Sequence, residues 1–371
     1  MMREQLLSRT ETNALRGLAI IGIILHNYCH FLSFAVKENE YTFDVTRPHQ
    51  MMEMLMSFDK DLFIHIFSFF GHYGVPVFLF ASGFGLVMKY EKSKSQGEVA
   101  VLPFMTYHYL KLFRLMILGF ITFIIVYILR HDDGAVVYAF DRVVSQLTMV
   151  INFVYDKPQK IIKPGPYWYF GLMVQLYLLY RLVCYRRRQP SIIIVMIIAA
   201  LFIQYLCRDN NDALNYVRYN FIGGVLPFGM GILYARHGKM LSTVGNIAMV
   251  IISALMVLFG SMSFLSWLIV PCFIVTGAVA TVQLLPARLQ SPWVWLGTLS
   301  AALFVMHPVM REVIIPHYRR VDIYFGIWTY LLSSVALAML LQYVLRWIPS
   351  PKMKKDQSQI QQKQVINNED R

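Results

Sequence analysis

Apolar segments alternate with short polar stretches along almost the whole chain. Ten of them have roughly the 18–26 mostly apolar residues that an α-helix needs to cross about 30 Å of hydrocarbon. They span residues 14–36, 62–88, 104–129, 167–184, 191–207, 219–235, 244–260, 264–285, 293–313 and 323–348. The pattern predicts an all-α integral membrane protein with about ten transmembrane helices.

The polar stretches between the segments differ in length. The loops at 37–61 and 130–166 are longer than a simple connection requires, and residues 143–154 within the second are apolar but too short to span, which predicts a helix at the membrane interface. From residue 349 the chain is rich in Lys and Gln. We therefore expect a membrane domain at 1–348, a disordered cytoplasmic tail at 349–371, and no appended soluble domain.

Composition supports the membrane assignment. Apolar residues make up 57% of the 371 residues and charged residues 15%, and the mean hydropathy is +0.50. Soluble domains contain about 45–50% apolar and about 25% charged residues, so this chain has too little polar surface to coat a water-soluble globule. The same numbers exclude a disordered protein.

The net charge of +13 arises from 34 Lys and Arg against 21 Asp and Glu. In a membrane protein such an excess reflects cytoplasmic loops, which collect basic residues, so we expect no nucleic-acid partner. Two short loops are strongly basic, one with Arg186, Arg187 and Arg188 and one with Arg236 and Lys239. Placing them inside the cell puts both termini in the cytoplasm.

Ionisable groups within the spans indicate where chemistry takes place, because each is costly in hydrocarbon without a partner or a wet cavity. His26 follows Arg16 by ten residues, a rise of about 15 Å, which places it near the bilayer midplane. His30 is one turn further on the same face. An imidazole there can accept a proton, or can simply bond a neighbouring helix. Two His at this spacing can also bind zinc, but no carboxylate or thiolate has matching spacing, so we expect no metal.

Three basic residues lie near the predicted cytoplasmic ends of two spans. Lys111 and Arg114 are neighbours on one helix face, and Arg16 starts the first span. Together they can bind a phosphorylated ligand, or they can extend to lipid headgroups.

Other polar or small residues in the spans have two interpretations each. Ser82 and Gly83 can line a ligand tunnel or allow close helix packing. Gln175 is a buried amide that needs a partner. His307 precedes Pro308, so it can orient a substrate or bond a carbonyl that the proline frees.

Four segments resemble, in order, the membrane acyltransferase 3 family, whose multi-span members O-acylate carbohydrates and related acceptors at the bacterial cytoplasmic membrane. The matching segments are LRGLAIIGIILH, YGVPVFLFASGF, YWYFGLMVQLYLLYRL and LGTLSAALFVMHP. The chain differs from the family pattern in having nine residues, one fewer, between Arg16 and His26, and Met173 and Val174 where many members have Glu.

The resemblance implies a mechanism. Acyl-CoA, expected to be acetyl-CoA, is a co-substrate and no cofactor is permanently bound; Arg16, Lys111 and Arg114 would hold its phosphates. His26 would act on an acceptor hydroxyl as a general base, or carry the acyl group transiently. A set of further residues would line the tunnel or contact the acceptor: His30, Ser82, Gly83, Trp168, Gln175, Tyr177 and His307.

Two other classes of function fit part of the pattern. A transporter or flippase of a small or lipid-linked solute explains the spans and their charges, but not the four segments together. A structural subunit of an envelope assembly would have no need of polar groups at the midplane. The acceptor's identity, the acyl chain length and the oligomeric state are left open by the sequence.

Overall fold

The computed structural model describes residues 6–93 and 99–353, and within these ranges the secondary structure is helical, with no strand. Residues 354–371, most of the predicted tail, lie outside the described part. The long helices are α1 (Arg9–Cys29), α4 (Gly74–Tyr90), α5 (Val101–Ile128), α10 (Trp168–Leu179), α11 (Pro190–Leu206), α13 (Phe221–His237), α14 (Thr243–Gly260), α15 (Phe264–Leu284), α16 (Ala287–Tyr318) and α17 (Ile323–Leu345).

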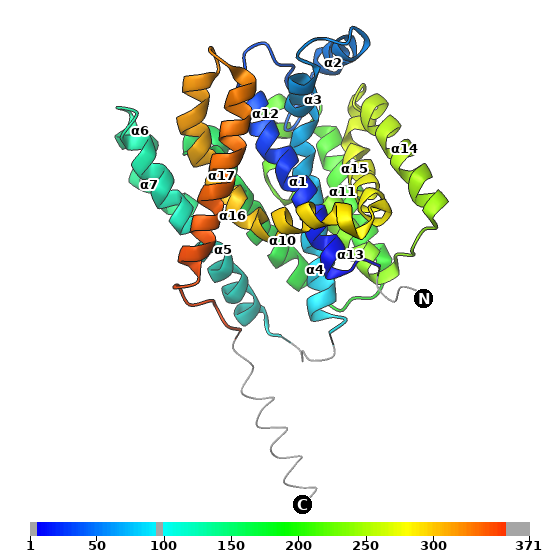
Figure 1. Cartoon of the computed structure of the whole chain (residues 1–371). Helices are drawn as coiled ribbons and strands as arrows, with labels where there is room; N and C mark the ends of the chain where they lie inside the picture. The colour runs from blue at the N-terminus through cyan, green and yellow to red at the C-terminus, as the bar shows by residue number, and fades with distance from the viewer. Residues whose placement is uncertain (1–5, 94–98, 354–371) are drawn as a thin grey trace, which may run out of the picture.

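Helix α1 runs through the middle of the bundle, with α17 on one side and α14 and α15 on the other, and the first part of α16 crosses it in the view of Figure 1. It packs most extensively against α16. Glycines make this contact possible: a Cβ at Gly17 would overlap the Trp293 carbonyl, and one at Gly297 would overlap the Asn13 carbonyl. The two helix backbones therefore touch, which fixes where α1 holds its polar side chains.

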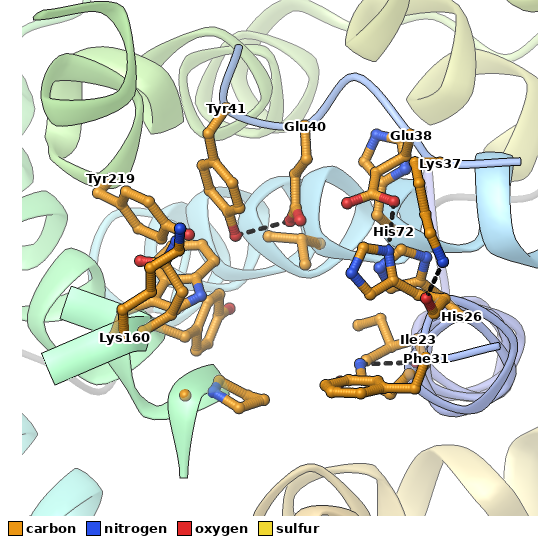
Figure 2. Close-up of a pocket in the computed structure, with 18 of the residues that line it drawn as sticks. Ile23, His26, Phe31, Lys37, Glu38, Glu40, Tyr41, His72, Lys160 and Tyr219 are labelled. Atoms are coloured by element: carbon orange, nitrogen blue, oxygen red, sulfur yellow. Dashed lines mark hydrogen bonds and ion pairs between the residues drawn. The ribbon is translucent and has the colours of Figure 1, made fainter. Parts of the chain in front are cut away.

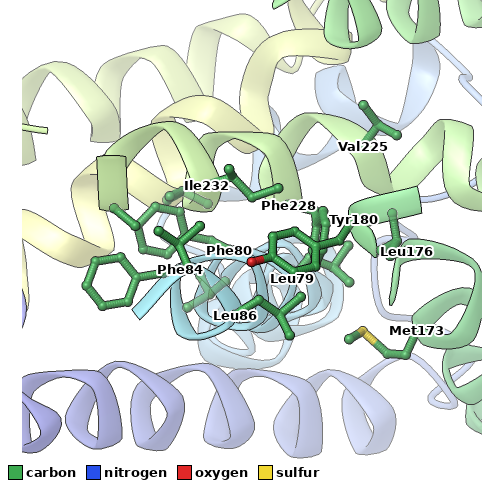
Figure 3. Close-up of a cluster of buried hydrophobic side chains, with 14 of the residues drawn as sticks. Leu79, Phe80, Phe84, Leu86, Met173, Leu176, Tyr180, Val225, Phe228 and Ile232 are labelled. Atoms are coloured by element: carbon green, nitrogen blue, oxygen red, sulfur yellow. The ribbon is translucent and has the colours of Figure 1, made fainter. Parts of the chain in front are cut away.

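Two apolar clusters flank α1. One joins α4, α10 and α13 and contains Phe80, Leu176 and Phe228, as Figure 3 shows. The other joins α1, α5, α16 and α17 and contains Ile24 and Leu303. Because these clusters are dry and closely packed, the polar residues of α1 are confined to the space between them and the loop after α1.

Each of the ten predicted segments is helical, but six are long and apolar enough to cross a membrane by themselves. These six are Leu62–Tyr90, Val101–Ile128, Thr243–Gly260, Phe264–Leu284, Ala287–Tyr318 and Ile323–Leu345. Helices α11 and α13 have 17 residues and α10 has 12, and α1 begins with charged residues. The count of ten spans and the sides of the termini stay predictions.

The second predicted span is not one regular α-helix. It consists of α3 (Leu62–Phe70), a single 3-10 turn η1 (Gly71–Tyr73) and α4. At this turn the chain packs closely on α1, because a Cβ at Gly71 would lie 2.6 Å from the Gly22 carbonyl oxygen and 2.7 Å from the His26 Cβ. Gly83 instead lies within regular helix, where it contacts α13.

The predicted end of the first span at Val36 is wrong. Helix α1 ends at Cys29. The turn that follows is stabilised by the Lys37 ammonium, which donates to the carbonyls of His30 and Leu32. Helix α2 (Thr46–Met56) follows in the same loop. The early turn brings the residues after Val36 back over the end of α1.

The predicted interfacial helix at 143–154 is divided. Helix α7 (Phe140–Leu147) and the single turn α8 (Ile151–Val154) are separated at Met149, whose φ of 59° ends helical geometry. The loop also contains the short turns α6 (Gly134–Val137) and α9 (Pro158–Ile161) and the 3-10 turn η2 (Gly165–Tyr167). Its last part, from Gln159 to Pro166, forms one wall of the cavity described next.

Candidate active site

A cavity of about 510 Å³ lies between α1, the loop that follows it, α16 and the end of the 130–166 loop. Figure 2 shows its two facing sides: His26, His72 and Glu38 on one, and Tyr41, Glu40, Tyr219 and Lys160 on the other. Its volume is typical of a small-molecule site, and charged groups and aromatic rings line it together.

The His26 ring is held in one tautomer. Its Nδ1 lies 2.9 Å from the Ser68 carbonyl oxygen, and the Ser68 hydroxyl donates in turn to the Val36 carbonyl at 2.6 Å. A carbonyl only accepts, so Nδ1 carries the hydrogen and the neutral ring has its lone pair on Nε2. The side chain is 7% exposed and lines the cavity. This nitrogen is therefore a fixed base at the edge of a polar cavity.

A carboxylate stands next to this base. Glu38 Oε2 lies 2.6 Å from His30 Nδ1, and the His26 and His30 ring centroids are 5.3 Å apart. Burial alone would raise the pKa of Glu38, but the hydrogen bond from His30 and the ring of His26 together hold that pKa well below its usual range. Glu38 is ionised, and its negative charge favours a protonated imidazole beside it.

His26, His30 and Glu38 also form a three-residue ligand set, with ligand atoms within 4.8 Å of one another. Glu38 supplies the carboxylate that the spacing of residues in the first span does not predict. Two ligands at 2.0–2.1 Å from a tetrahedral zinc would lie about 3.3 Å apart. The 2.6 Å separation of His30 and Glu38 is instead that of a direct hydrogen bond. The absence of a metal stays our prediction.

The opposite wall is aromatic. The Tyr41 and Tyr219 rings stack with centroids 3.8 Å apart, and the Trp168 ring meets each of them edge to face. The Tyr41 hydroxyl donates to Glu40 Oε1 at 2.7 Å. Burial and the nearby Glu38 carboxylate raise the pKa of Glu40 to about 8, although the hydrogen bond from Tyr41 opposes the shift. Glu40 is mostly protonated at neutral pH.

Glu40 makes the stability of the protein depend on pH. Between its ordinary pKa of 4.5 and about 8 the folded chain holds a proton that the unfolded chain has lost, so stability falls as pH rises, by at most about 1.4 kcal/mol per pH unit. We expect Glu40→Gln to flatten the fall in thermal unfolding midpoint between pH 5 and pH 8. Glu53→Gln, on exposed α2, should keep the wild-type slope. Equal slopes for both variants would contradict this assignment.

A family model described as an acyltransferase domain, Acyl_transf_3, matches residues 10–347, nearly the whole chain. The chain belongs to the acyltransferase 3 family. The resemblance drawn from four segments is thereby confirmed, and the protein is an acyltransferase with membrane-spanning helices. Searches among curated proteins and among solved structures gave no match.

Three of the site residues that the sequence predicts for this acyltransferase line the cavity: His26, His30 and Trp168. Arg16 does not, and helix geometry explains why. Ten residues at 100° each set the Arg16 and His26 side chains about 80° apart around α1 and about 15 Å apart along it. Arg16 lies close enough to Lys111 for their charges to interact, so these two predicted partners share one region.

Arg114 is engaged elsewhere. Its guanidinium donates to the carbonyls of Leu345 and Ile348 and to the Ser350 hydroxyl, so it caps the end of α17. It is thus positioned to stabilise the acyltransferase bundle, and its predicted role in binding CoA is not supported by these contacts.

The remaining predicted residues outside the cavity have packing partners. Gln175 bonds the Asn220 side chain and the Phe221 amide, each at 2.8 Å, at the start of α13. The Ser82 hydroxyl bonds its own helix at Phe78, and a Cβ at Gly83 would overlap the Phe228 carbonyl.

The other two members of that predicted set do not line the cavity either. His307 Nδ1 bonds the Leu303 carbonyl at 3.0 Å, within its own helix, and the ring is fully buried. The Tyr177 ring packs 4.4 Å from the His108 ring. The bonded carbonyl is that of Leu303, whereas Pro308 frees the carbonyl of Phe304, so the predicted roles of His307 stay predictions.

Sequence reasoning missed most of the charged and aromatic residues of this site, including three near the predicted histidines. Glu38 lies in a loop, His72 in the break of the second span, and Arg311 one turn beyond His307. His72 Nδ1 is buried without a hydrogen-bond partner among the described residues, and its ring lies 5.7 Å from that of His26. The signal available in the sequence was charge: Glu38 follows His30 closely, and Arg311 is a charge within an apolar span.

Proposed function

We propose that this acyltransferase moves an acyl group, expected to be acetyl, from cytoplasmic acyl-CoA to a hydroxyl of a carbohydrate or related envelope acceptor, within the cytoplasmic membrane of a bacterium. One observation carries the proposal. His26 Nε2 is a base of fixed orientation at the edge of a cavity, with Nδ1 held by the Ser68 carbonyl and an ionised carboxylate near by.

In the proposed step His26 Nε2 accepts the proton of the acceptor hydroxyl. The hydroxyl oxygen bonds to the thioester carbonyl carbon, the carbon–sulfur bond breaks, and the CoA thiolate takes the proton from the imidazolium. An ester and free CoA result, so atoms and charge balance. The Ser68 carbonyl and the Glu38 carboxylate both stabilise the imidazolium that forms between the two proton transfers.

Two cations support a donor site at the other end of α1. Arg16 and Lys111 interact with each other, and among the described residues neither has a carboxylate within ion-pair distance. Tyr169 lines the cavity and also interacts with Arg16, so it marks the boundary between the two regions. The pantetheine arm of CoA is long and thin enough to cover the intervening distance of about 15 Å along α1.

This donor site yields a prediction on affinity. The double variant Arg16→Gln, Lys111→Gln should raise the Kd of acetyl-CoA about tenfold or more, because each lost charge-assisted bond to phosphate is worth about 1.5–3 kcal/mol. Calorimetric titration of the purified protein measures it, with exposed Arg288→Gln as the control. An unchanged Kd in the double variant would contradict the donor site.

The activity itself is tested by label transfer. Protein in liposomes is incubated with radiolabelled acetyl-CoA and a panel of glycans, and the expected result is a labelled ester that mild alkali releases. No labelled ester with any acceptor in the panel, together with intact binding of acetyl-CoA, would contradict an acetyl donor and carbohydrate acceptor.

A further inference from the structure

The wall of the cavity carries cations that have no carboxylate partner. Among the described residues, Lys160, Lys163 and Arg311 form no ion pair. The nearest acidic neighbour in sequence, Glu312, is bonded to His131 at 2.6 Å. These three positive charges therefore face the cavity without an ion-pair partner of their own, although the Glu312 carboxylate acts on Arg311 and Lys163 from a distance.

Arg311 is held in place by uncharged partners. Its Nη1 donates to Asn27 Oδ1 at 2.6 Å, and its guanidinium lies 4.6 Å from the Phe31 ring centroid. These contacts use only part of the five N–H donors of the Arg311 guanidinium. Arg311 is 9% exposed and its guanidinium is oriented, which is what a site for a bound oxyanion requires.

Like charges act on one another at this cavity. Burial and the Arg311 guanidinium lower the pKa of Lys163, Lys160 adds to the effect, and the more distant Glu312 and Asp133 carboxylates offset only part of it. The two carboxyl groups of the cavity do not relieve the repulsion, because Glu38 is paired with His30 and Glu40 is mostly protonated at neutral pH. An anion bound among the three cations would remove this repulsion.

The same cavity presents flat rings. The stacked pair Tyr41 and Tyr219 lies on the same side as Lys160, across the cavity from His26 (Figure 2), and the Trp168 ring meets the Tyr219 ring edge to face. Aromatic faces suit the apolar faces of a sugar ring, and their hydroxyl groups suit its edge. A sugar on this wall with its anionic group at the lysines would have its hydroxyls facing the His26 side.

We propose that the acceptor is an anionic carbohydrate, whose phosphate or carboxylate is bound by Lys160, Lys163 and Arg311. The proposal rests on the acyltransferase function above and names the acceptor class for the same site. A sugar phosphate, as in a lipid-linked sugar, and a uronic acid share the oxyanion chemistry that these cations recognise.

Binding of sugars in the absence of acyl transfer tests the proposed acceptor class. Affinities of glucose 1-phosphate, glucuronate and glucose for the purified full chain are compared by calorimetric titration in the absence of acetyl-CoA. At least one anion should bind about tenfold or more tightly than glucose. The double variant Lys160→Gln, Lys163→Gln should lower the affinity for that anion about tenfold or more. The anion that responds identifies the source of the charge. Arg320→Gln, exposed after α16, is the matched control.

Two results would overturn the proposal. One is equal affinity for glucose and both anions. The other is a loss of affinity for adenosine 3′,5′-bisphosphate, a fragment of CoA, in the double lysine variant, which would assign these cations to the donor. Because no acyl transfer is measured, failure here leaves the acetyl-transfer assay as an independent test of the proposed function.

Discussion

Replacing His26 with alanine should lower kcat for acyl transfer by about 10²–10⁴-fold, the range for loss of a positioned general base. The substitution removes the Nε2 lone pair at the cavity while leaving the apolar clusters around α1 in place. The measurement is the rate of labelled ester formation from radiolabelled acetyl-CoA at saturating donor. The Kd of acetyl-CoA should change little, because the proposed phosphate contacts lie at the other end of α1.

His49→Ala is the matched control for this prediction. His49 is an exposed histidine on α2, and it does not line the cavity. It should keep the wild-type kcat. A His26→Ala variant that folds, binds acetyl-CoA and retains most of its kcat would show that the base lies elsewhere.

The second large effect is on folding. Gly297→Ala would place a Cβ in the space of the Asn13 carbonyl oxygen, and backbone atoms cannot move aside as a flexible side chain can. The α1 and α16 helices would have to separate, which we expect to cost about 3 kcal/mol, the upper end of the usual range for overpacking. The measurement is the thermal unfolding midpoint of the detergent-solubilised protein, and acyl transfer should fall with it, since both helices line the cavity.

Gly85→Ala provides the comparison for Gly297→Ala. Nothing lies within 4 Å of a Cβ at Gly85, and the residue is within α4, where alanine favours the helix by about 0.8–1.0 kcal/mol. Its midpoint should be unchanged or higher. Equal midpoints for the two variants would show that the glycine contact between α1 and α16 is not tight.

The sequence predicted those features that depend on local pattern. Apolar segments became helices near their predicted limits, because a span must satisfy its backbone hydrogen bonds internally. The spacing of His26 and His30 placed both on one face of α1 and, in the structure, on one cavity. The four segments that resemble the family were confirmed by the match over residues 10–347.

The features that depend on long-range contacts were missed. Glu38 reaches His30 only because α1 ends at Cys29 and Lys37 bonds the carbonyls of the turn, and no periodicity in the sequence marks that end. Arg311 reaches the cavity from 284 residues along the chain, where it bonds Asn27.

The charge of a residue does not by itself identify the group that the residue binds. Arg114 has the spacing of a phosphate-binding residue, but it bonds the end of α17. Whether a basic residue binds phosphate or caps a helix depends on where a distant helix ends. The polarity of a span thus indicates that a partner exists, and tertiary packing decides which partner it is.

The structure of the protein with a non-hydrolysable thioether analogue of acetyl-CoA tests the central claim most directly. We predict phosphate groups at Arg16 and Lys111, and the acyl end in the cavity beside His26, with room for an acceptor hydroxyl about 3–3.5 Å from the acyl carbonyl carbon. An analogue bound with its acyl end outside this cavity and away from His26 would contradict the account.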